Sequence, residues 1–378
     1  MKSLKNIFKL EIDPKRIYGL DIIRALAIWF VIYAHSLTYL EHLIPIQYLR
    51  RGMYDGVSIF FTLSGFLIGG ILIKILEKEQ KLNTQILWNF WKRRWLRTLP
   101  NYFLILSILV IYFLLFRDFE GIAYWKYFFF IQNLGTPQPW FFGESWSLSI
   151  EEWFYLITPI GLLICIKYLK LKLKHSMILV ASTLIFLSLW ARVGQYAASY
   201  PFPMDLTRYG SLIRMQIQTR LDGLMIGVLA ACLQFYKPIF WKQKQKLMFL
   251  VGLIFLIIYY FFKDQVLPMS WGVASPLVIA LGVALILPYL NDIKHGKGVL
   301  FKIITYISLT SYSAYLINLA LVQDIVVYNL SKLLPGHWPL GILSFVQLIL
   351  FFTLTFGGAI LLYKYFELPI MKLRDKKK

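Results

Sequence analysis

The sequence predicts an all-α polytopic membrane protein with about ten transmembrane helices and both termini in the cytoplasm. Hydrophobic residues make up 58% of its 378 positions and charged residues only 16%, a balance outside the range of soluble globular domains. Apolar runs long enough to cross a bilayer recur from end to end, which leaves no room for a soluble domain.

Each transmembrane helix needs about 20 predominantly apolar residues. Runs of this kind are predicted at 17–39, 54–76, 99–117, 146–168, 176–196, 213–235, 247–263, 270–290, 303–326 and 341–364. The aromatic stretch 123–134 is too short to span, so we expect an interfacial or re-entrant segment there. The first run contains Asp21 and Arg24 and no small-residue cleavage site follows it, so we interpret it as a retained helix.

Basic residues alternate between loops as the positive-inside rule requires. Twenty-eight of the 40 Lys and Arg residues fall in the segments 1–16, 77–98, 167–175, 236–246, 291–302 and 364–378. Ten spans place all of these segments on the cytoplasmic side. The chain is therefore divided into a cytoplasmic N-terminal segment (1–16), a membrane domain (17–364) and a basic cytoplasmic tail (365–378).

The net charge of +21 does not indicate nucleic-acid binding, because the cations lie between apolar runs rather than along one solvated face. Cys165 and Cys232 both lie inside apolar runs and are interpreted as small buried hydrophobes. The sequence contains no zinc-binding HExxH helix, and we expect no metal. The oligomeric state is left open.

The first helix carries an arginine and a histidine eleven residues apart, in "RALAIWFVIYAHS". Eleven helical steps place Arg24 and His35 about 20° apart around the axis and about 16 Å apart along it. Ionisable groups inside a bilayer usually face a cavity and serve function, here by holding an anion at one end and moving a proton at the other. The alternative is that Arg24 merely pairs with Asp21 while His35 completes a buried hydrogen bond.

A basic segment, "WNFWKRRWLRTLPNY", lies at a predicted cytoplasmic boundary. Guanidinium groups bind phosphate oxygens in a forked geometry, so Arg93, Arg94 and Arg97 are candidates for a phosphate site. Such a segment is equally typical of an interfacial lipid anchor. Pro100 is expected to break the segment from the helix that follows.

Two further groups of polar residues lie at or within predicted spans. The segment "ESWSLSIEEWFY" brings Glu151 and Glu152 into the outer end of a helix, where one of them can orient a histidine or bind a hydroxylated substrate. The alternative is an interfacial helix start with Glu144 as an exposed loop charge. In "TRLDGLMIG", Arg220 and Asp222 lie within the membrane and can pair with groups on other helices.

Seven motifs then resemble, in order, the acyltransferase type 3 family of integral membrane acyltransferases, which includes bacterial O-antigen O-acetylases. They are "LDIIRALAIWFVIYAHS", "GVSIFFTLSGFLIGGIL", "KRRWLRTLPNYF", "SWSLSIEEWFYLITP", "TRLDGLMIG", "SYSAYLIN" and "YFELPI". The resemblance covers nearly the whole chain. It implies a ten-helix membrane O-acyltransferase that moves an acyl group, most often acetyl from cytoplasmic acetyl-CoA, to a hydroxyl of an extracytoplasmic glycan or similar acceptor.

The resemblance also implies residue roles. Arg24 and His35 match the family's essential pair, and the basic segment matches the one associated with the acyl-CoA donor. The residues expected to be catalytic are His35, Arg24, Glu151 and Glu152; those expected at the donor are Arg93, Arg94 and Arg97; those expected to bind substrate are Trp146, Ser147, Arg220 and Asp222. The motif "SYSAYLIN" often ends in histidine in the family, whereas Asn318 here cannot carry a proton. We expect no appended extracytoplasmic esterase-like domain.

Together these features predict acyl-CoA as the donor co-substrate, a carbohydrate or lipid-linked glycan as the acceptor, membrane lipids as the surroundings and the bacterial cytoplasmic (inner) membrane as the location. His35 either removes the acceptor's proton or takes the acyl group and passes it on. The alternative function is a polysaccharide or lipid transporter or flippase without acyl-transfer chemistry, since transporters also place charged residues on cavity-facing helices.

Overall fold

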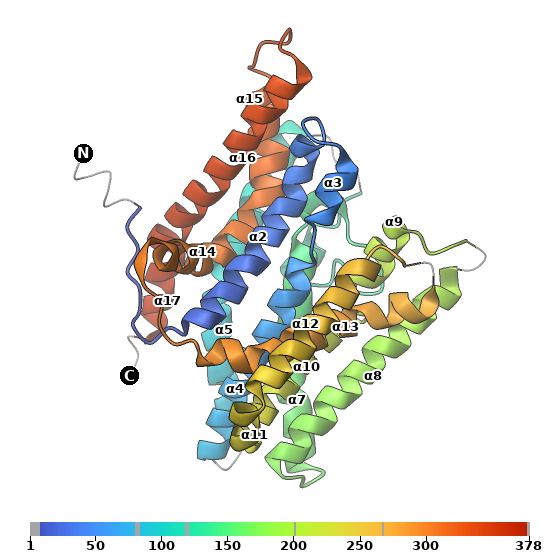
Figure 1. Ribbon diagram of the computed structural model, residues 1–378, viewed down its shortest axis with the longest axis vertical. Helices are drawn as coiled ribbons and strands as arrows, with labels where there is room; N and C mark the ends of the chain where they lie inside the picture. The colour runs from blue at the N-terminus through green and yellow to red at the C-terminus, as the bar shows by residue number, and fades with distance from the viewer. Residues whose placement is uncertain (1–7, 80–83, 118–120, 200–201, 267, 376–378) are drawn as a thin grey trace.

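A computed structural model describes residues 8–79, 84–117, 121–199, 202–266 and 268–375, and all regular secondary structure in these ranges is helical (Figure 1). Residues 1–7 of the predicted N-terminal segment and 376–378 of the predicted tail lie outside the described residues. The long helices are α2 (Tyr18–Leu40), α4 (Gly56–Glu79), α5 (Thr84–Phe116), α7 (Ser145–Lys167), α8 (Leu173–Ser199), α10 (Leu221–Tyr236), α12 (Gln245–Phe262), α13 (Met269–Asp292), α14 (Gly298–Ile317) and α16 (Leu340–Leu362). The short helices are α3 (Ile46–Arg51), α6 (Trp125–Phe128), α9 (Leu206–Arg208), α11 (Pro238–Gln243), α15 (Tyr328–Ser331) and α17 (Leu368–Asp375).

The predicted all-α polytopic architecture is confirmed. Within the described ranges, nine helices are long and apolar enough to cross a membrane. The span predicted at 213–235 is α10, which has only 16 residues because a π-helical turn (Tyr209–Arg214) and a non-helical stretch ending at Arg220 precede it. The stretch 123–134 contains only the four-residue α6, as its length predicts.

The expectation that Pro100 separates the basic segment from the next helix is wrong, because α5 runs through Pro100 without interruption. A membrane helix tolerates proline where neighbouring groups hold the backbone on both sides. Here the Tyr312 hydroxyl donates to the backbone carbonyl of Thr98 at 2.6 Å. The side chains of Thr98 and Asn101, on either side of Pro100, donate to Glu152 Oε1 at 2.8 Å and to Glu367 Oε2 at 3.0 Å. The arginines of the basic segment therefore share one continuous helix with residues buried in the bundle.

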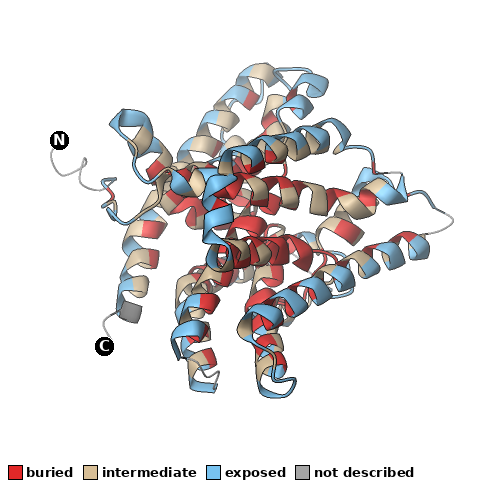
Figure 2. Cartoon of the chain, turned by 60° about the horizontal axis from the view of Figure 1, so that its bottom comes forward, coloured by how far each residue is buried: buried red, intermediate tan, exposed pale blue. Residues whose placement is uncertain are grey.

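The centre of the bundle is formed where α4 packs along α10, and both helices are largely buried (Figure 2). Gly65 permits this approach, because a Cβ atom there would lie 1.8 Å from the carbonyl oxygen of Leu224. Small residues at such contacts let two helix backbones approach closely.

Cys165 and Cys232 are buried and unbonded, as predicted.

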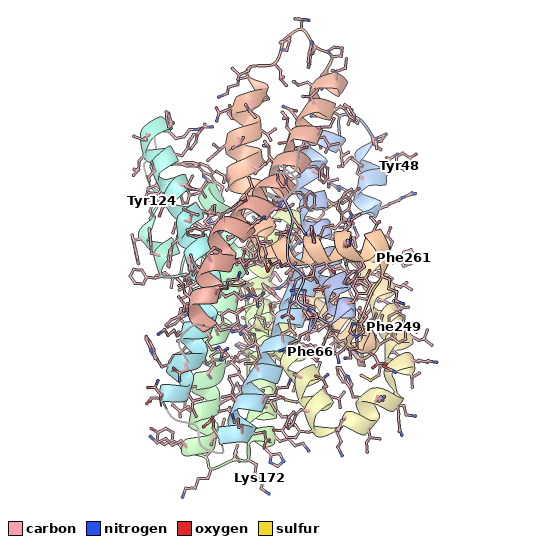
Figure 3. All side chains as sticks on the ribbon, turned by 90° about the vertical axis from the view of Figure 1, so that its left-hand side faces the viewer. Tyr48, Phe66, Tyr124, Lys172, Phe249 and Phe261 are labelled. Atoms are coloured by element: carbon pink, nitrogen blue, oxygen red, sulfur yellow. The ribbon has the colours of Figure 1, made fainter. Side chains whose placement is uncertain are left out.

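The outer helices present apolar side chains to the surroundings. On α12 only Met248 and Gly252 are buried. Phe261 of the same helix is 69% exposed and lies at the edge of the molecule (Figure 3). Such a surface fits contact with lipid. The C-terminal end of α4, the N-terminal end of α5, the α7–α8 connection and α11, all in segments predicted to be cytoplasmic, lie at one end of the bundle (Figure 1). Which side of the membrane this end faces stays a prediction.

Two helices continue into π-helical turns. Helix α14 passes into a π-helical segment at Asn318–Val327, and α16 passes into another at Tyr363–Glu367. Such segments are rare and frequently occur at functional sites, because the wider turn changes the direction of side chains.

Candidate functional site

Arg24 and His35 line two different cavities next to α2. The Arg24 cavity has a volume of about 120 Å³ and the His35 cavity about 460 Å³. Val57 and Tyr315 line both, so they form the partition between them. Helix α2 thus presents the cation and the imidazole to two separate cavities, rather than to one cavity along a common face as expected.

The Arg24 cavity is rich in guanidinium groups. Its polar lining comes from five helices and consists of Arg24 (α2), Ser64 (α4), Arg94, Arg97 and Thr98 (α5), Ser147, Glu151 and Tyr155 (α7), and Ser311, Tyr312 and Tyr315 (α14). Three arginines thus face one carboxylate. In a low-dielectric interior this excess of positive charge favours an anionic or strongly polarised ligand.

Arg24 is not firmly held by Asp21. The two side chains approach only to 4.0 Å, while Asp21 accepts hydrogen bonds from Arg16 Nε at 3.0 Å and Ser308 Oγ at 2.7 Å. The main ion partner of Asp21 is therefore Arg16, which sequence reasoning missed. The guanidinium of Arg24 keeps donors that can face the cavity.

The basic segment divides into arginines that line the cavity and one that does not. Arg94 and Arg97 are three residues apart and lie on the same helix face. Arg93, one step away, is exposed and is not among the lining residues. Trp91 Nε1 donates to the carbonyl of Tyr155 at 2.8 Å, which fixes this part of α5 against α7.

The adjacent glutamates also have different surroundings. Successive helix positions point about 100° apart. Glu151 lines the Arg24 cavity, whereas Glu152 accepts the hydrogen bond from Thr98 on α5 and does not line it. Of the two carboxylates, the structure brings only Glu151 to the arginines.

His35 is held in one orientation by Asn318. Its Nδ1 lies 2.5 Å from Asn318 Oδ1. The amide nitrogen of Asn318 donates to the carbonyls of Ala314 at 3.0 Å and Tyr315 at 2.7 Å, so its Oδ1 must be the acceptor. His35 therefore donates from Nδ1, and in the neutral ring Nε2 carries a free lone pair. Sequence reasoning described what Asn318 cannot do and missed this positioning role.

The partition between the cavities is itself hydrogen-bonded. Tyr315 and Ser147 place their hydroxyl oxygens 2.6 Å apart, and the Tyr315 hydroxyl also donates to the carbonyl of Glu144 at 3.0 Å. Ser147 lines the Arg24 cavity and Trp146 the His35 cavity. Two of the four residues expected to bind substrate, Trp146 and Ser147, thus lie on opposite sides of the partition.

The alternative of Glu144 as an exposed loop charge is wrong, since only 2% of the residue is exposed. It lies directly before α7, lines the His35 cavity and accepts the backbone N–H of Ala320 at 3.2 and 3.3 Å. Burial raises the pKa of Glu144 to about 8. Within the His35 cavity this carboxyl group can therefore exist in its protonated form near neutral pH.

Arg220 and Asp222 do not join a common site. Arg220 donates to Ser58 Oγ at 2.6 Å and lines a third cavity. Asp222 is fully buried and forms an ion pair with Arg192 at 2.8 Å. Asp222 is absent from the linings of the Arg24 and His35 cavities, so its surroundings are those of a structural ion pair.

The fold and these cavities define a multi-pass membrane protein with a buried polar site divided between two spaces. Residues 17–364 match the Acyl_transf_3 family, described as an acyltransferase domain, and the chain belongs to this family. Within the described residues no group of three or more His, Cys, Asp or Glu side chains is placed to hold a metal ion.

Similar proteins are known from Listeria monocytogenes and Staphylococcus aureus. The peptidoglycan O-acetyltransferase OatA of Listeria monocytogenes is 27% identical over 95% of this chain, and the O-acetyltransferase OatA of Staphylococcus aureus is 28% identical over 61% of it. The chain covers only 56% and 36% of the length of these two proteins. No solved structure matches the chain.

Proposed function

We propose that this protein is an O-acetyltransferase of the bacterial cytoplasmic membrane that moves acetyl from acetyl-CoA to a hydroxyl of a cell-envelope glycan. Membership of the acyltransferase family and similarity to proteins named peptidoglycan O-acetyltransferases support the reaction class and the acceptor class. Within this proposal acetyl-CoA enters from the cytoplasm and the glycan from the outer side.

The observation that carries the proposal is the meeting of two cavities of different chemistry at one partition. One cavity offers guanidinium groups and the other an imidazole nitrogen with a free lone pair. A group-transfer enzyme needs an anion-binding side for its donor and a base for the attacking hydroxyl. Tyr315 and Val57 separate the two, so one small movement there would join donor and acceptor.

The donor side suits a thioester carried on a long arm. The volume of about 120 Å³ is below the roughly 300–1,000 Å³ of sites that enclose a whole drug-sized ligand. We therefore assign the cavity to the acyl and pantetheine end of acyl-CoA, with Arg94 and Arg97 nearest the phosphates. Arg24, deeper along α2, is then available to stabilise negative charge on the thioester oxygen.

The chemistry assigned to His35 uses its Nε2 lone pair. As the acceptor hydroxyl oxygen attacks the thioester carbonyl carbon, Nε2 takes the hydroxyl proton and the carbon–sulfur bond breaks. The leaving thiolate then takes this proton from Nε2 and becomes the free thiol. In the two-step form of the reaction the same lone pair attacks the thioester carbon first, and CoA leaves as the thiolate. The acceptor hydroxyl oxygen then attacks the acetyl carbon, the bond to Nε2 breaks, and the hydroxyl proton passes through Nε2 to the thiolate. Asn318 holds the ring in the tautomer that both forms require.

The test is acetyl transfer by the purified full-length protein in lipid nanodiscs, measured as CoA release together with acetylated glycan. We expect His35→Ala to lose about 10²-fold or more in kcat. His175→Ala, which removes an exposed histidine on α8, is the matched control and should retain full activity. Full activity in His35→Ala would contradict the assignment, and glycan movement without acetyl transfer would favour a transporter.

A further inference from the structure

A third cavity adjoins the His35 cavity and carries an excess of positive charge. It has a volume of about 270 Å³ and shares Ala34, Tyr54 and Arg214 with the His35 cavity. Its charged lining consists of the cations Arg50, Arg214, Arg220 and Lys263 and the carboxylates Asp55 and Asp264. We call it the Arg214 cavity.

One buried carboxylate holds two of these arginines. Asp55 Oδ1 lies 3.3 Å from Arg214 Nη2, and its Oδ2 lies 3.8 Å from Arg220 Nη2. Ser58 completes the cluster, donating from its backbone N–H and its hydroxyl to Asp55 at 3.0 and 2.7 Å. Two guanidinium groups therefore share a single counter-charge, and a buried excess of charge is costly unless a further anion compensates it.

Arg214 is the residue best placed to meet such an anion. Its side chain is 39% exposed, it lines both cavities, and its buried Nε has no hydrogen-bond partner among the described residues. The π-helical turn Tyr209–Arg214 ends at this residue and presents it between the two spaces. Lys263 is already paired with Asp264 at 3.7 Å and donates to the carbonyl of Arg50 at 2.9 Å.

We propose that the Arg214 cavity binds an anionic group of the acceptor, a carboxylate or a phosphate, while a hydroxyl of the same molecule reaches His35. The proposal rests on the function assigned above and narrows the acceptor class from glycans in general to acidic glycans. Arginine binds both anions through paired N–H donors, so the shared chemistry defines the site.

The test compares three sugars as ligands of the purified full-length protein in nanodiscs. They are N-acetylglucosamine, the 3-O-lactyl ether of N-acetylglucosamine, and N-acetylglucosamine 1-phosphate. The lactyl ether adds one carboxylate to the neutral sugar, and the 1-phosphate adds one phosphate. Binding is measured as thermal stabilisation, which requires no catalysis, and as competition with acetyl transfer to a neutral chitin oligomer. We expect at least one anionic sugar to bind about tenfold more tightly than the neutral one, and the sugar that does so identifies the anion.

Arg214→Gln should remove this preference while leaving the KM for acetyl-CoA unchanged, and Arg214→Lys should restore part of it. Arg208→Gln, which removes a half-buried cation outside the cavity, is the matched control and should keep the preference. Equal binding of neutral and anionic sugars by the unmodified protein would overturn the proposal, whether or not Arg214→Gln folds. Absence of acetyl transfer with any acceptor would instead overturn the proposed function and leave the binding comparison intact.

Discussion

At the scale of single residues, the contact between His35 and Asn318 determines which imidazole nitrogen can react. Two backbone carbonyls fix the Asn318 amide, and the amide fixes the ring. The sequence predicts His35 from its position in an apolar helix. It does not predict its partner, because Asn318 lies 283 positions away and only the packing of α14 beside α2 brings them together.

Asn318→Ala is expected to lower kcat about ten- to a hundredfold, since loss of the group that fixes a histidine's tautomer has effects of this size. The KM for acetyl-CoA should change little, because Asn318 is not among the residues lining the Arg24 cavity. Asn318→Asp, which keeps an acceptor oxygen toward Nδ1, should retain more activity. Steady-state kinetics on the three proteins check this, and equal activity in wild type and Asn318→Ala would contradict it.

The basic segment gives a second prediction at this scale. Arg97→Gln is expected to raise the KM for acetyl-CoA about tenfold or more, because hydrogen bonds to charged groups contribute about 1.5–3 kcal/mol. Arg93→Gln provides the matched control: its side chain is exposed and absent from the cavity lining, so its KM should stay near the wild-type value. If both variants weakened binding equally, the segment would act as a lipid anchor rather than as a donor site.

At the scale of helices, the close packing of α4 and α10 depends on Gly65. Gly65→Ala is expected to destabilise the protein by about 1–3 kcal/mol or more, because the new methyl group meets the Leu224 carbonyl and a backbone must shift. Gly70→Ala on the same helix meets no atom within 4 Å and should leave stability unchanged or raise it slightly. Thermal unfolding in detergent measures the pair, and equal melting temperatures would refute the packing argument.

The ion pair between α8 and α10 gives a prediction about Asp222. Removing one partner of a buried pair costs about 3–5 kcal/mol, so Asp222→Asn should sharply reduce the yield of folded protein. Protein that does fold should keep the wild-type KM for both substrates. Asp13→Asn, which neutralises an exposed aspartate, should have no effect on yield. A variant that folds normally but loses acceptor affinity would restore the substrate-binding role.

At the scale of the whole molecule, the sequence predicts an all-α polytopic membrane protein, because bilayer thickness imposes a length on each apolar run. It does not predict the short α10, which follows a π-helical turn and a non-helical stretch. It also does not predict the uninterrupted α5, because the groups that Thr98 and Asn101 contact come from distant parts of the sequence. It identifies Arg24, His35 and Glu151 as unusual charges in apolar surroundings. It misses Asp55, Arg192 and Arg214, whose significance comes from partners on other helices.

The proposed function uses the division of the site between two cavities to bring donor and acceptor together from opposite sides of the membrane. Their separate linings, joined only at Val57 and Tyr315, support entry of each substrate by its own route. The proposed function requires the two substrates to enter from opposite sides of the membrane. This requirement distinguishes it from a mechanism in which both substrates share a single pocket.

The most direct test uses sealed proteoliposomes with radiolabelled acetyl-CoA on one side of the membrane and a glycan acceptor trapped on the other. Protein oriented with its termini on the acetyl-CoA side should acetylate the trapped glycan, and His35→Ala reconstituted in the same orientation should not. Protein that acetylates glycan only when both substrates are on the same side would contradict transfer through the two cavities.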